Sequence, residues 1–288
     1  MADMNGKTCI VTGGTSGIGE ASARALAQHG ADVAIVCRSR ERGEATRGRI
    51  EAAVGRPCVR LFQADFERLE EVARVGEALA RELPRVDVLL NNAGVTMLGR
   101  SETPDGYETT FAVNHLAPFL LTHRVLPRLL ETPGARVVNV SSGAHRFARL
   151  DPDDLHSRRR YSTMRVYGAS KLCNILFTNE LARRLEGRDL RIWSLHPGAV
   201  ATRLGANNGG IAKVLLPALA LFFKTPEQGA ATSIRLCSDP DLDAPNGTYF
   251  ENEKPAKVSA RARDADLARR LWIESERLVG LEPNAVWG

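Results

Sequence analysis

The sequence predicts a doubly wound α/β domain, and three observations support this fold class. Short apolar runs alternate with longer helical patterns along all 288 residues, as in strands joined by right-handed helical crossovers. Several runs are almost continuously apolar, such as residues 34–37 and 137–140, which is typical of parallel strands buried on both faces. No internal repeat, low-complexity tract or Pro/Gly/Ser-rich linker divides the chain. We therefore expect residues 1–288 to form a single domain.

The predicted elements alternate regularly through the first two thirds of the chain. We expect strands at residues 7–12, 32–37, 58–63, 86–91, 136–141 and 190–196. We expect the helices between them at about residues 17–29, 40–54, 67–82, 105–130 and 164–186. An approximate apolar stripe supports the third helix and consists of Leu69, Val72, Ala73, Val75 and Gly76. Residues 143–165 and 202–225 are predicted to be excursions from the sheet.

Composition and charge favour a globular protein without a nucleic-acid partner or a membrane span. The net charge of +5 comes from scattered arginines, densest at residues 158–160, with no aromatic-and-basic motif beside them. The most apolar segment, residues 211–223, contains Lys213 and Pro217 and is shorter than the roughly 20 residues that cross a bilayer. The five cysteines are odd in number and lack metal-ligand spacing. We expect no metal site and a cytoplasmic location.

A glycine-rich loop between the first strand and the first helix predicts a dinucleotide site. Residues 13–19 read Gly-Gly-Thr-Ser-Gly-Ile-Gly, and glycines let the backbone approach a pyrophosphate closely. The helix that follows presents free N–H groups and a partial positive charge to the anion. The alternative is a glycine-rich turn with no ligand. The predicted cofactor contacts in this loop are Gly13, Thr15, Ser16, Gly17, Ile18 and Gly19.

The end of the second strand predicts NADP(H) as the cofactor. A carboxylate about 20 residues past the loop would bind the ribose 2′-hydroxyl of NAD, but the strand ends in Arg38-Ser39-Arg40 with no acid. A guanidinium suits the 2′-phosphate of NADP, which it can bind through paired hydrogen bonds. Arg38 is the first candidate and Arg40 the second, and Ser16 and Ser39 could add hydroxyl contacts. The alternative is that both arginines only face solvent.

An ordered set of motifs extends this pattern along the chain. It comprises the loop at residues 12–19, Asp65, Asn91-Asn92-Ala93-Gly94, Asn114, Ser142, Tyr167-Gly-Ala-Ser-Lys171 and Pro197-Gly198. With this set the chain resembles the short-chain dehydrogenase/reductase family over about residues 7–202. Its tail is similar to the subgroup that includes retinol dehydrogenases, through residues 247–250 and 271–276 and the 25-position step from Ser142 to Tyr167.

The resemblance implies a fold and a placement of the cofactor. The fold is a single Rossmann-type domain with a seven-stranded parallel sheet flanked by helices, and its cofactor half spans about residues 1–150. Asn114 is implied to hold a water in a proton relay from Lys171; the alternative is a hydrogen bond that only distorts its helix. The remaining implied contacts are Asp65 near the adenine, Asn92, Ala93 and Gly94 along the ribose, and Pro197, Gly198 and Thr202 at the nicotinamide end.

The excursion at residues 202–225 is implied to be a substrate lid. Its apolar part, residues 211–223, indicates a lipophilic aldehyde, ketone or alcohol as substrate, whereas a core segment or a membrane-facing surface are the alternatives. Gly205, Gly209 and Gly210 precede this part and can absorb rotation at a hinge. We therefore expect a mobile apolar lid.

The chemistry of carbonyl reduction needs a hydride, a proton and a group that stabilises the developing alkoxide. We expect NADP(H) to supply the hydride and Tyr167 to exchange the proton. Lys171 follows Tyr167 by four residues and so shares its helix face; we expect it to lower the tyrosine pKa and to hold the nicotinamide ribose. Ser142 follows a buried strand and is expected to stabilise the oxyanion, with Ser141 as its competitor. The alternatives are a core tyrosine, a surface lysine and a capping serine.

Two other functions stay open on the sequence. A sugar-nucleotide epimerase or dehydratase would recycle its bound cofactor, and a regulatory module would bind NADPH without needing Tyr167, Lys171 and Ser142. The expected partner is a small carbonyl or alcohol substrate, and a homo-oligomer stays open. His115, His145 and His196 are assigned no role in the predicted mechanism.

Overall fold

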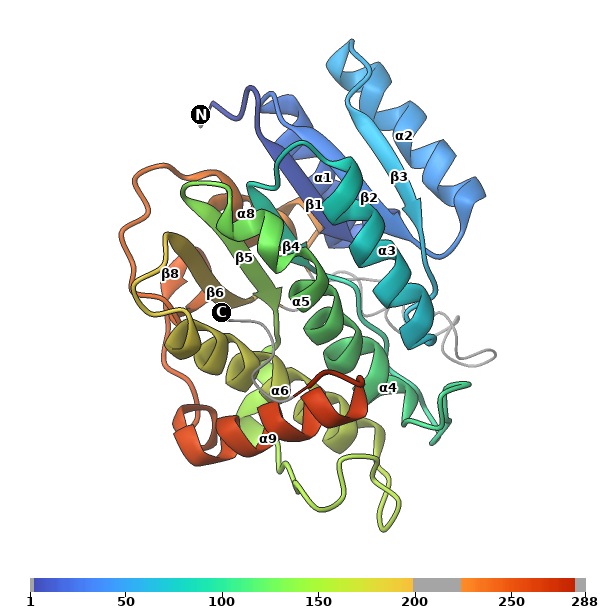
Figure 1. Ribbon diagram of the computed structural model, residues 1–288, viewed down its shortest axis with the longest axis vertical. Helices are drawn as coiled ribbons and strands as arrows, with labels where there is room; N and C mark the ends of the chain where they lie inside the picture. Colours follow the sequence, from blue (N-terminus) through green and yellow to red (C-terminus); the bar gives the residue numbers. More distant parts are fainter. Residues whose placement is uncertain (1–2, 199–223, 283–288) are drawn as a thin grey trace.

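A computed structural model describes residues 3–198 and 224–282, and within them one twisted sheet forms the centre of the molecule (Figure 1). Its strand order is β3-β2-β1-β4-β5-β6-β7-β8. β1 to β7 are parallel, as the predicted seven-stranded sheet requires, and β8 adds an antiparallel edge. The strands are β1 Thr8–Thr12, β2 Asp32–Cys37, β3 Val59–Gln63, β4 Val88–Asn91, β5 Ala135–Val140, β6 Leu190–His196, β7 Tyr249–Glu251 and β8 Lys254–Pro255.

Helices cover both faces of the sheet. The longer helices are α1 Gly17–Gln28, α2 Arg40–Val54, α3 Leu69–Glu82, α5 Ala117–Leu130, α6 Thr163–Arg184, α8 Pro226–Ser238 and α9 Ala265–Leu278. The shorter elements are α4 Thr109–Phe111, the π-helix η1 Ala112–Leu116, and the 3-10 helices η2 Gly143–Phe147 and η5 Ala260–Arg263.

Alternate residues of each central strand belong to different cores, as expected for a sheet buried on both faces. In β1, Ile10 packs with residues of α3, α5 and α6, whereas Cys9 and Val11 pack with residues of α1, α2 and α8. α9 covers the outer side of α6 (Figure 1). The doubly wound fold predicted from the apolar runs is therefore confirmed.

The predicted helix over residues 105–130 is wrong at its start. Glu108 begins the helix, because its carboxylate accepts the N–H groups of Thr110 and Phe111 at 2.9 and 2.7 Å. The chain then makes the π-helical turn η1 around Asn114 before α5 begins. The excursion at residues 143–165 contains η2 and then no helix or strand until α6, among residues that are all described. Most of the predicted lid, including residues 211–223, lies outside the described residues.

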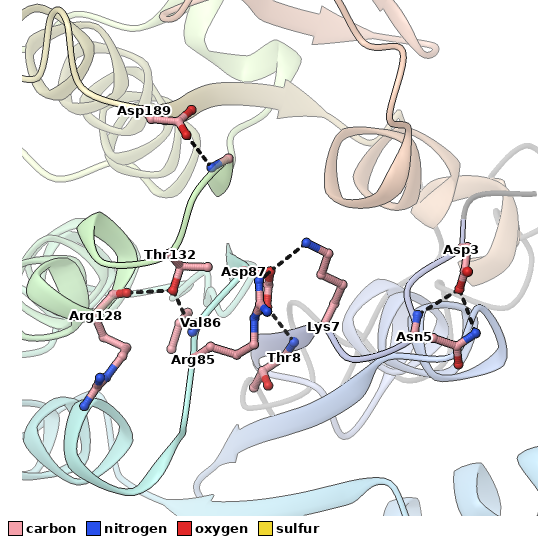
Figure 2. Close-up of polar contacts among 11 residues, drawn as sticks. Asp3, Asn5, Lys7, Thr8, Arg85, Val86, Asp87, Arg128, Thr132 and Asp189 are labelled. Carbon is pink, nitrogen blue, oxygen red and sulfur yellow. Dashed lines mark hydrogen bonds and ion pairs between the residues drawn. The ribbon is translucent and has the colours of Figure 1, made fainter.

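The amino-terminal ends of β1 and β4 are joined through the buried carboxylate of Asp87 (Figure 2). Asp87 accepts the N–H of Thr8 at 2.9 Å and two hydrogen bonds from Arg85 at 2.6 and 2.7 Å. Lys7 Nζ lies 3.1 Å from the same carboxylate. A buried charge needs such partners. This cluster therefore stabilises the amino-terminal ends of the central strands, opposite the carboxyl ends where the predicted site lies.

Candidate active site

The glycine loop brings the start of α1 close to the chain after β4. An added Cβ at Gly19 would collide with the carbonyl oxygen of Gly13 and with the side-chain amide of Asn92, so this close approach requires glycine. Ser16 occupies the N-cap of α1 in extended backbone, and its side chain makes no capping bond among the described residues. The first N–H groups of α1 are thus available to an anion such as a pyrophosphate.

Thr12 fastens the loop after β4 to the glycine loop, a role that the sequence reasoning missed. Its hydroxyl accepts the N–H groups of Asn92 and Ala93, both at 3.0 Å, and Asn92 Nδ2 donates to the Thr12 carbonyl at 2.9 Å. Asn91 faces away from the cofactor side, because its amide donates to Thr122 and Asn139. Asn91 therefore holds the strand that carries its neighbours.

A cavity of about 450 Å³ opens at the carboxyl ends of β1, β2, β4 and β5, where doubly wound proteins bind nucleotides. Gly198 does not line it, since Lys224 packs against that glycine, and Thr202 lies outside the described residues. The predicted residues that line it are Gly13, Thr15, Ser16, Gly17, Ile18, Gly19, Arg38, Asp65, Asn92, Ala93, Gly94, Tyr167, Lys171 and Pro197. Its size and its glycine-lined cradle fit a dinucleotide.

One end of this cavity carries Arg38 and Arg42, whereas Arg40 points elsewhere. Arg38 is half-exposed and lies 3.4 Å from Glu67 Oε1, which also lines the cavity. Arg40 pairs with Glu44 at 3.3 Å and is 68% exposed, so the second sequence candidate is not at the site. The sequence did not lead us to Arg42, which also lines the cavity. Two residues correspond to more than half a turn of helix, so Arg42 lies on the opposite face of α2 from Arg40. There it is close to Thr15 and Ser16.

Tyr167, Lys171 and Ser142 come together where β5 ends and α6 passes behind it. Lys171 Nζ lies 5.7 Å from the centre of the Tyr167 ring and donates to the Val140 carbonyl at 3.2 Å. The Ser142 hydroxyl lies beside Tyr167, where it favours a lower pKa of that tyrosine, and it accepts the N–H of Ala144 at 3.2 Å. Ser141 is buried and donates to the Lys171 carbonyl at 2.7 Å. The geometry thus places Ser142, not Ser141, beside the tyrosine.

Burial changes the proton affinities of Tyr167 and Lys171 in opposite directions. It raises the pKa of Tyr167 above its ordinary value, and the Ser142 hydroxyl opposes that rise. It lowers the pKa of Lys171 to about 8, since a buried ammonium loses its hydration. The expected lowering of the tyrosine pKa by Lys171 is not what this structure shows, because the lysine is itself buried and its ammonium is directed at Val140. The pKa values of the two groups, which are close together for free side chains, are therefore moved apart, and Lys171 becomes the group that loses its proton first.

Asn114 joins three parts of the site from the π-helical turn. Its amide exchanges two hydrogen bonds with the backbone of Val95, at 2.7 and 3.0 Å, and donates to Ser170 Oγ at 3.0 Å. An added Cβ at Gly94 would lie 3.3 Å from Asn114 Oδ1 and 3.4 Å from Lys171 Nζ. Asn114 therefore sits next to Lys171 while it holds the loop after β4 against α6.

Comparison with known proteins agrees with this arrangement. Residues 7–210 match the family described as short chain dehydrogenase. The chain belongs to this family. It is 40% identical to retinol dehydrogenase 12 of Mus musculus, over 96% of this chain and 87% of that protein. The predicted likeness to the retinol dehydrogenase subgroup is therefore confirmed.

Solved structures show the same fold. An uncharacterized protein from Mycobacterium paratuberculosis has a TM-score of 0.79 and 33% identity, covering 98% of this chain and 96% of its own. A short chain dehydrogenase from Burkholderia cenocepacia in complex with NADP has a TM-score of 0.68 and 30% identity, covering 86% and 96%. This short-chain dehydrogenase is an NAD(P)-dependent oxidoreductase.

Among the described residues, no helix is long and apolar enough to cross a membrane.

His145, given no role from the sequence, positions Ser142 in this short-chain dehydrogenase. Its Nδ1 lies 2.8 Å from the Ser142 carbonyl oxygen, so Nδ1 carries the proton that is donated. Burial lowers the pKa of His145, which keeps the ring neutral and preserves this tautomer at neutral pH. The other two histidines lie elsewhere: His115 bonds Ser275 at 2.8 Å, and His196 lies 3.9 Å from Glu251.

Gly168 lets α6 pack closely on η2, and its replacement tests that contact. An added Cβ would lie 2.9 Å from the Ala144 carbonyl oxygen, so Gly168→Ala should push Tyr167 away from Ser142. Small misplacements of reacting groups are costly, so we expect turnover to fall by about 10- to 100-fold. Affinity for the nicotinamide cofactor should change less, because the glycine loop is untouched. Steady-state kinetics and a fluorescence titration measure the two effects.

Gly48→Ala is the matched control for this substitution. No atom lies within 4 Å of a Cβ added there, and α2 should gain about 0.5–1 kcal/mol of stability from the loss of a helix glycine. Turnover should stay at the wild-type value. Wild-type turnover in Gly168→Ala as well would show that the close packing does not position the tyrosine.

Proposed function

We propose that this enzyme transfers a hydride between NADP(H) and a lipophilic carbonyl or alcohol. The observation that carries the proposal is that Tyr167 and Lys171 line the cavity at the carboxyl end of β5, with the Ser142 hydroxyl beside Tyr167. The cofactor supplies the hydride. In reduction, the Tyr167 hydroxyl donates a proton to the substrate oxygen, while the Ser142 hydroxyl hydrogen-bonds the same oxygen as negative charge grows on it.

Lys171 and Asn114 support the proton transfer. Lys171 is buried next to the tyrosine and to Gly94, so it can share a proton with Tyr167 and contact the nicotinamide ribose. Asn114 fixes the loop beside it, and a relay through water at this point is part of the proposal. The lipophilic substrate class rests on the likeness to retinol dehydrogenase 12 and on the apolar residues 211–223.

A turnover assay tests the function directly. Purified enzyme is mixed with NADPH and a panel of aldehydes and ketones of increasing chain length, and the nicotinamide absorbance is followed. We expect stoichiometric NADPH oxidation, fastest with the apolar members. A module that only senses NADPH would bind it without turnover, and an epimerase or dehydratase would convert its substrate with no net change in absorbance.

The two arginines at the adenosine end predict a preference for NADPH over NADH. Hydrogen bonds to charged groups contribute about 1.5–3 kcal/mol, which corresponds to roughly 10- to 150-fold in affinity. We expect Arg38→Ala to weaken NADPH binding by the lower part of that range, since Arg38 is half-exposed and already forms an ion pair with Glu67. Arg42→Ala should also weaken NADPH binding, whereas NADH binding should change little in both variants.

Arg40→Ala provides the matched control, because Arg40 lies on α2 with Arg42 but outside the cavity. Fluorescence titrations of both cofactors measure the four proteins. Equal affinity of the wild type for NADPH and NADH would contradict the preference. A loss in Arg40→Ala as large as that in Arg38→Ala would contradict the assignment of residues.

A further inference from the structure

Three large apolar side chains are exposed on the side of the molecule that carries the catalytic groups. Leu98, Phe147 and Met164 are 61, 90 and 69% exposed, and we call them the apolar rim. In the described part of the chain only one other large apolar side chain, Ile273 on α9, is exposed. Scattered exposed apolar residues are ordinary, whereas a group of them marks a contact surface.

The rim residues come from three segments that are joined by hydrogen bonds and by close packing. The Thr163 hydroxyl donates to the Leu98 carbonyl at 3.0 Å, and the Tyr161 hydroxyl donates to the Met97 carbonyl at 2.8 Å. Met164 precedes Gly168 by one helical turn, and the space beside Gly168 is filled by Ala144 and Ala148 of the segment that carries Phe147. The three segments that carry these side chains therefore lie next to one another.

This surface adjoins the active site along the chain. Leu98 follows Gly94 by four residues, Phe147 follows Ser142 by five, and Met164 precedes Tyr167 by three. The loop between η2 and α6, green to yellow at the lower edge of Figure 1, projects from the body of the molecule here. A contact made by the rim would therefore bring the catalytic end of the enzyme to the surface that is contacted.

The segments that carry the apolar rim are rich in exposed arginine. Residues 97–102 and 145–165 contain seven arginines and four acidic residues, and all seven arginines are exposed. Three of them pair with acids: Arg100 with Glu102, Arg146 with Glu251, and Arg159 with Asp151 and Asp154. Within the described residues the other four form no ion pair; they are Arg149, Arg158, Arg160 and Arg165.

We propose that this face docks on an anionic lipid surface, with the apolar rim entering the headgroup boundary and the arginines contacting the headgroups. Stable peripheral binding needs both signals together. A protein partner would instead favour a contiguous apolar centre depleted of charge, whereas here single apolar tips stand among arginines. The inference rests on the proposed function, because a lipid surface would hold the lipophilic substrate that the enzyme is proposed to use. The test of lipid binding does not depend on turnover.

Vesicle flotation of the full chain tests the proposal. We expect binding to phosphatidylcholine vesicles that contain phosphatidylserine, little binding to phosphatidylcholine alone, and release as salt screens the arginines. The variant Leu98→Ser/Phe147→Ser/Met164→Ser should bind at least about tenfold more weakly, since burial of each apolar side chain is lost. Replacement of the four arginines without ion pairs by glutamine should abolish the preference for phosphatidylserine. Ile273→Ser is the matched control and should bind like the wild type.

A second measurement locates the contact without the triple variant. Phe147→Trp places a fluorophore at the most exposed rim position, and its added emission should shift to the blue with phosphatidylserine vesicles only. Equal binding to both vesicle types, no blue shift, or loss in Ile273→Ser as large as in the rim variant would overturn the proposal. So would a dimer in solution that the rim variant dissociates, because a second copy would then be the occupant. A protein that floats as expected but oxidises no NADPH would contradict only the proposed function.

Discussion

Tyr167→Phe is expected to lower carbonyl reduction by about 10²-fold or more, the usual scale for a positioned acid or base. The substitution removes one oxygen atom and leaves the ring in place beside Lys171, so the cavity keeps its shape. The affinity for NADPH should therefore stay near the wild-type value. Steady-state rates on a carbonyl that the wild type reduces, together with a fluorescence titration of NADPH, measure the two expectations.

Tyr107→Phe is the matched control for Tyr167→Phe. Its hydroxyl donates to the Leu278 carbonyl at 2.7 Å and does not line the cavity, so stability should fall by about 1 kcal/mol while turnover persists. Wild-type turnover in Tyr167→Phe would mean that the proton comes from another group. His196 and Tyr161 would then be the groups to replace next.

The central fold could be predicted because its signals are local. Both faces of the parallel strands are buried, so the strands have apolar runs that are visible in the sequence. The bounds of α2 match the predicted residues 40–54, because Ser39 caps its start and Gly55 ends it in the left-handed region. In contrast, β8 depends on a two-residue turn at Asn252 and Glu253, both with positive φ. Two residues give no apolar pattern from which a strand could be predicted.

The finer parts of the site depend on contacts between segments far apart in the chain. Asn114 bonds Val95 and Ser170, which lie 19 and 56 residues away, and the local helical pattern carries no sign of the π-helical turn. Arg42 could have been found from helix geometry, since a residue two positions after Arg40 faces another direction. The opposite pKa changes of Tyr167 and Lys171 follow from burial, which spacing alone does not give.

Lys171→Met is expected to remove alcohol oxidation near neutral pH by changing which group releases the first proton. Oxidation needs a proton acceptor, so the pair of Tyr167 and Lys171 must already have lost one proton. In the wild type that proton leaves with an apparent pKa near 8, because burial lowers the pKa of Lys171 to about 8, although the value belongs to the pair. The oxidation rate should therefore rise with pH through about pH 8.

In Lys171→Met only Tyr167 remains, and burial holds its pKa above the ordinary value of about 10. At pH 8 no more than about 1% of the enzyme would then have an ionised tyrosine, so the rate should fall by about 10²-fold. Raising the pH above about 10 should restore part of it. Lys254→Met, at an exposed position, should keep the wild-type profile.

Stability separates this expectation from simple misfolding. The pKa of Lys171 is lower in the folded protein than the ordinary value of 10.5, so below about pH 8 the fold bears the full cost of a buried ammonium. That cost decreases as pH rises from about 8 toward the unfolded value. Methionine removes the charge at similar volume, and the Val140 carbonyl still accepts from Asn174 Nδ2 at 3.2 Å.

Lys171→Met should therefore unfold at a higher urea concentration than the wild type at pH 7, while its rate of alcohol oxidation falls. This is a trade-off between stability and activity. Urea unfolding and a pH–rate profile on the same preparation measure both. A less stable Lys171→Met would indicate a structural lysine whose loss disturbs the site. A profile that still rises through about pH 8 would assign that proton to a different group.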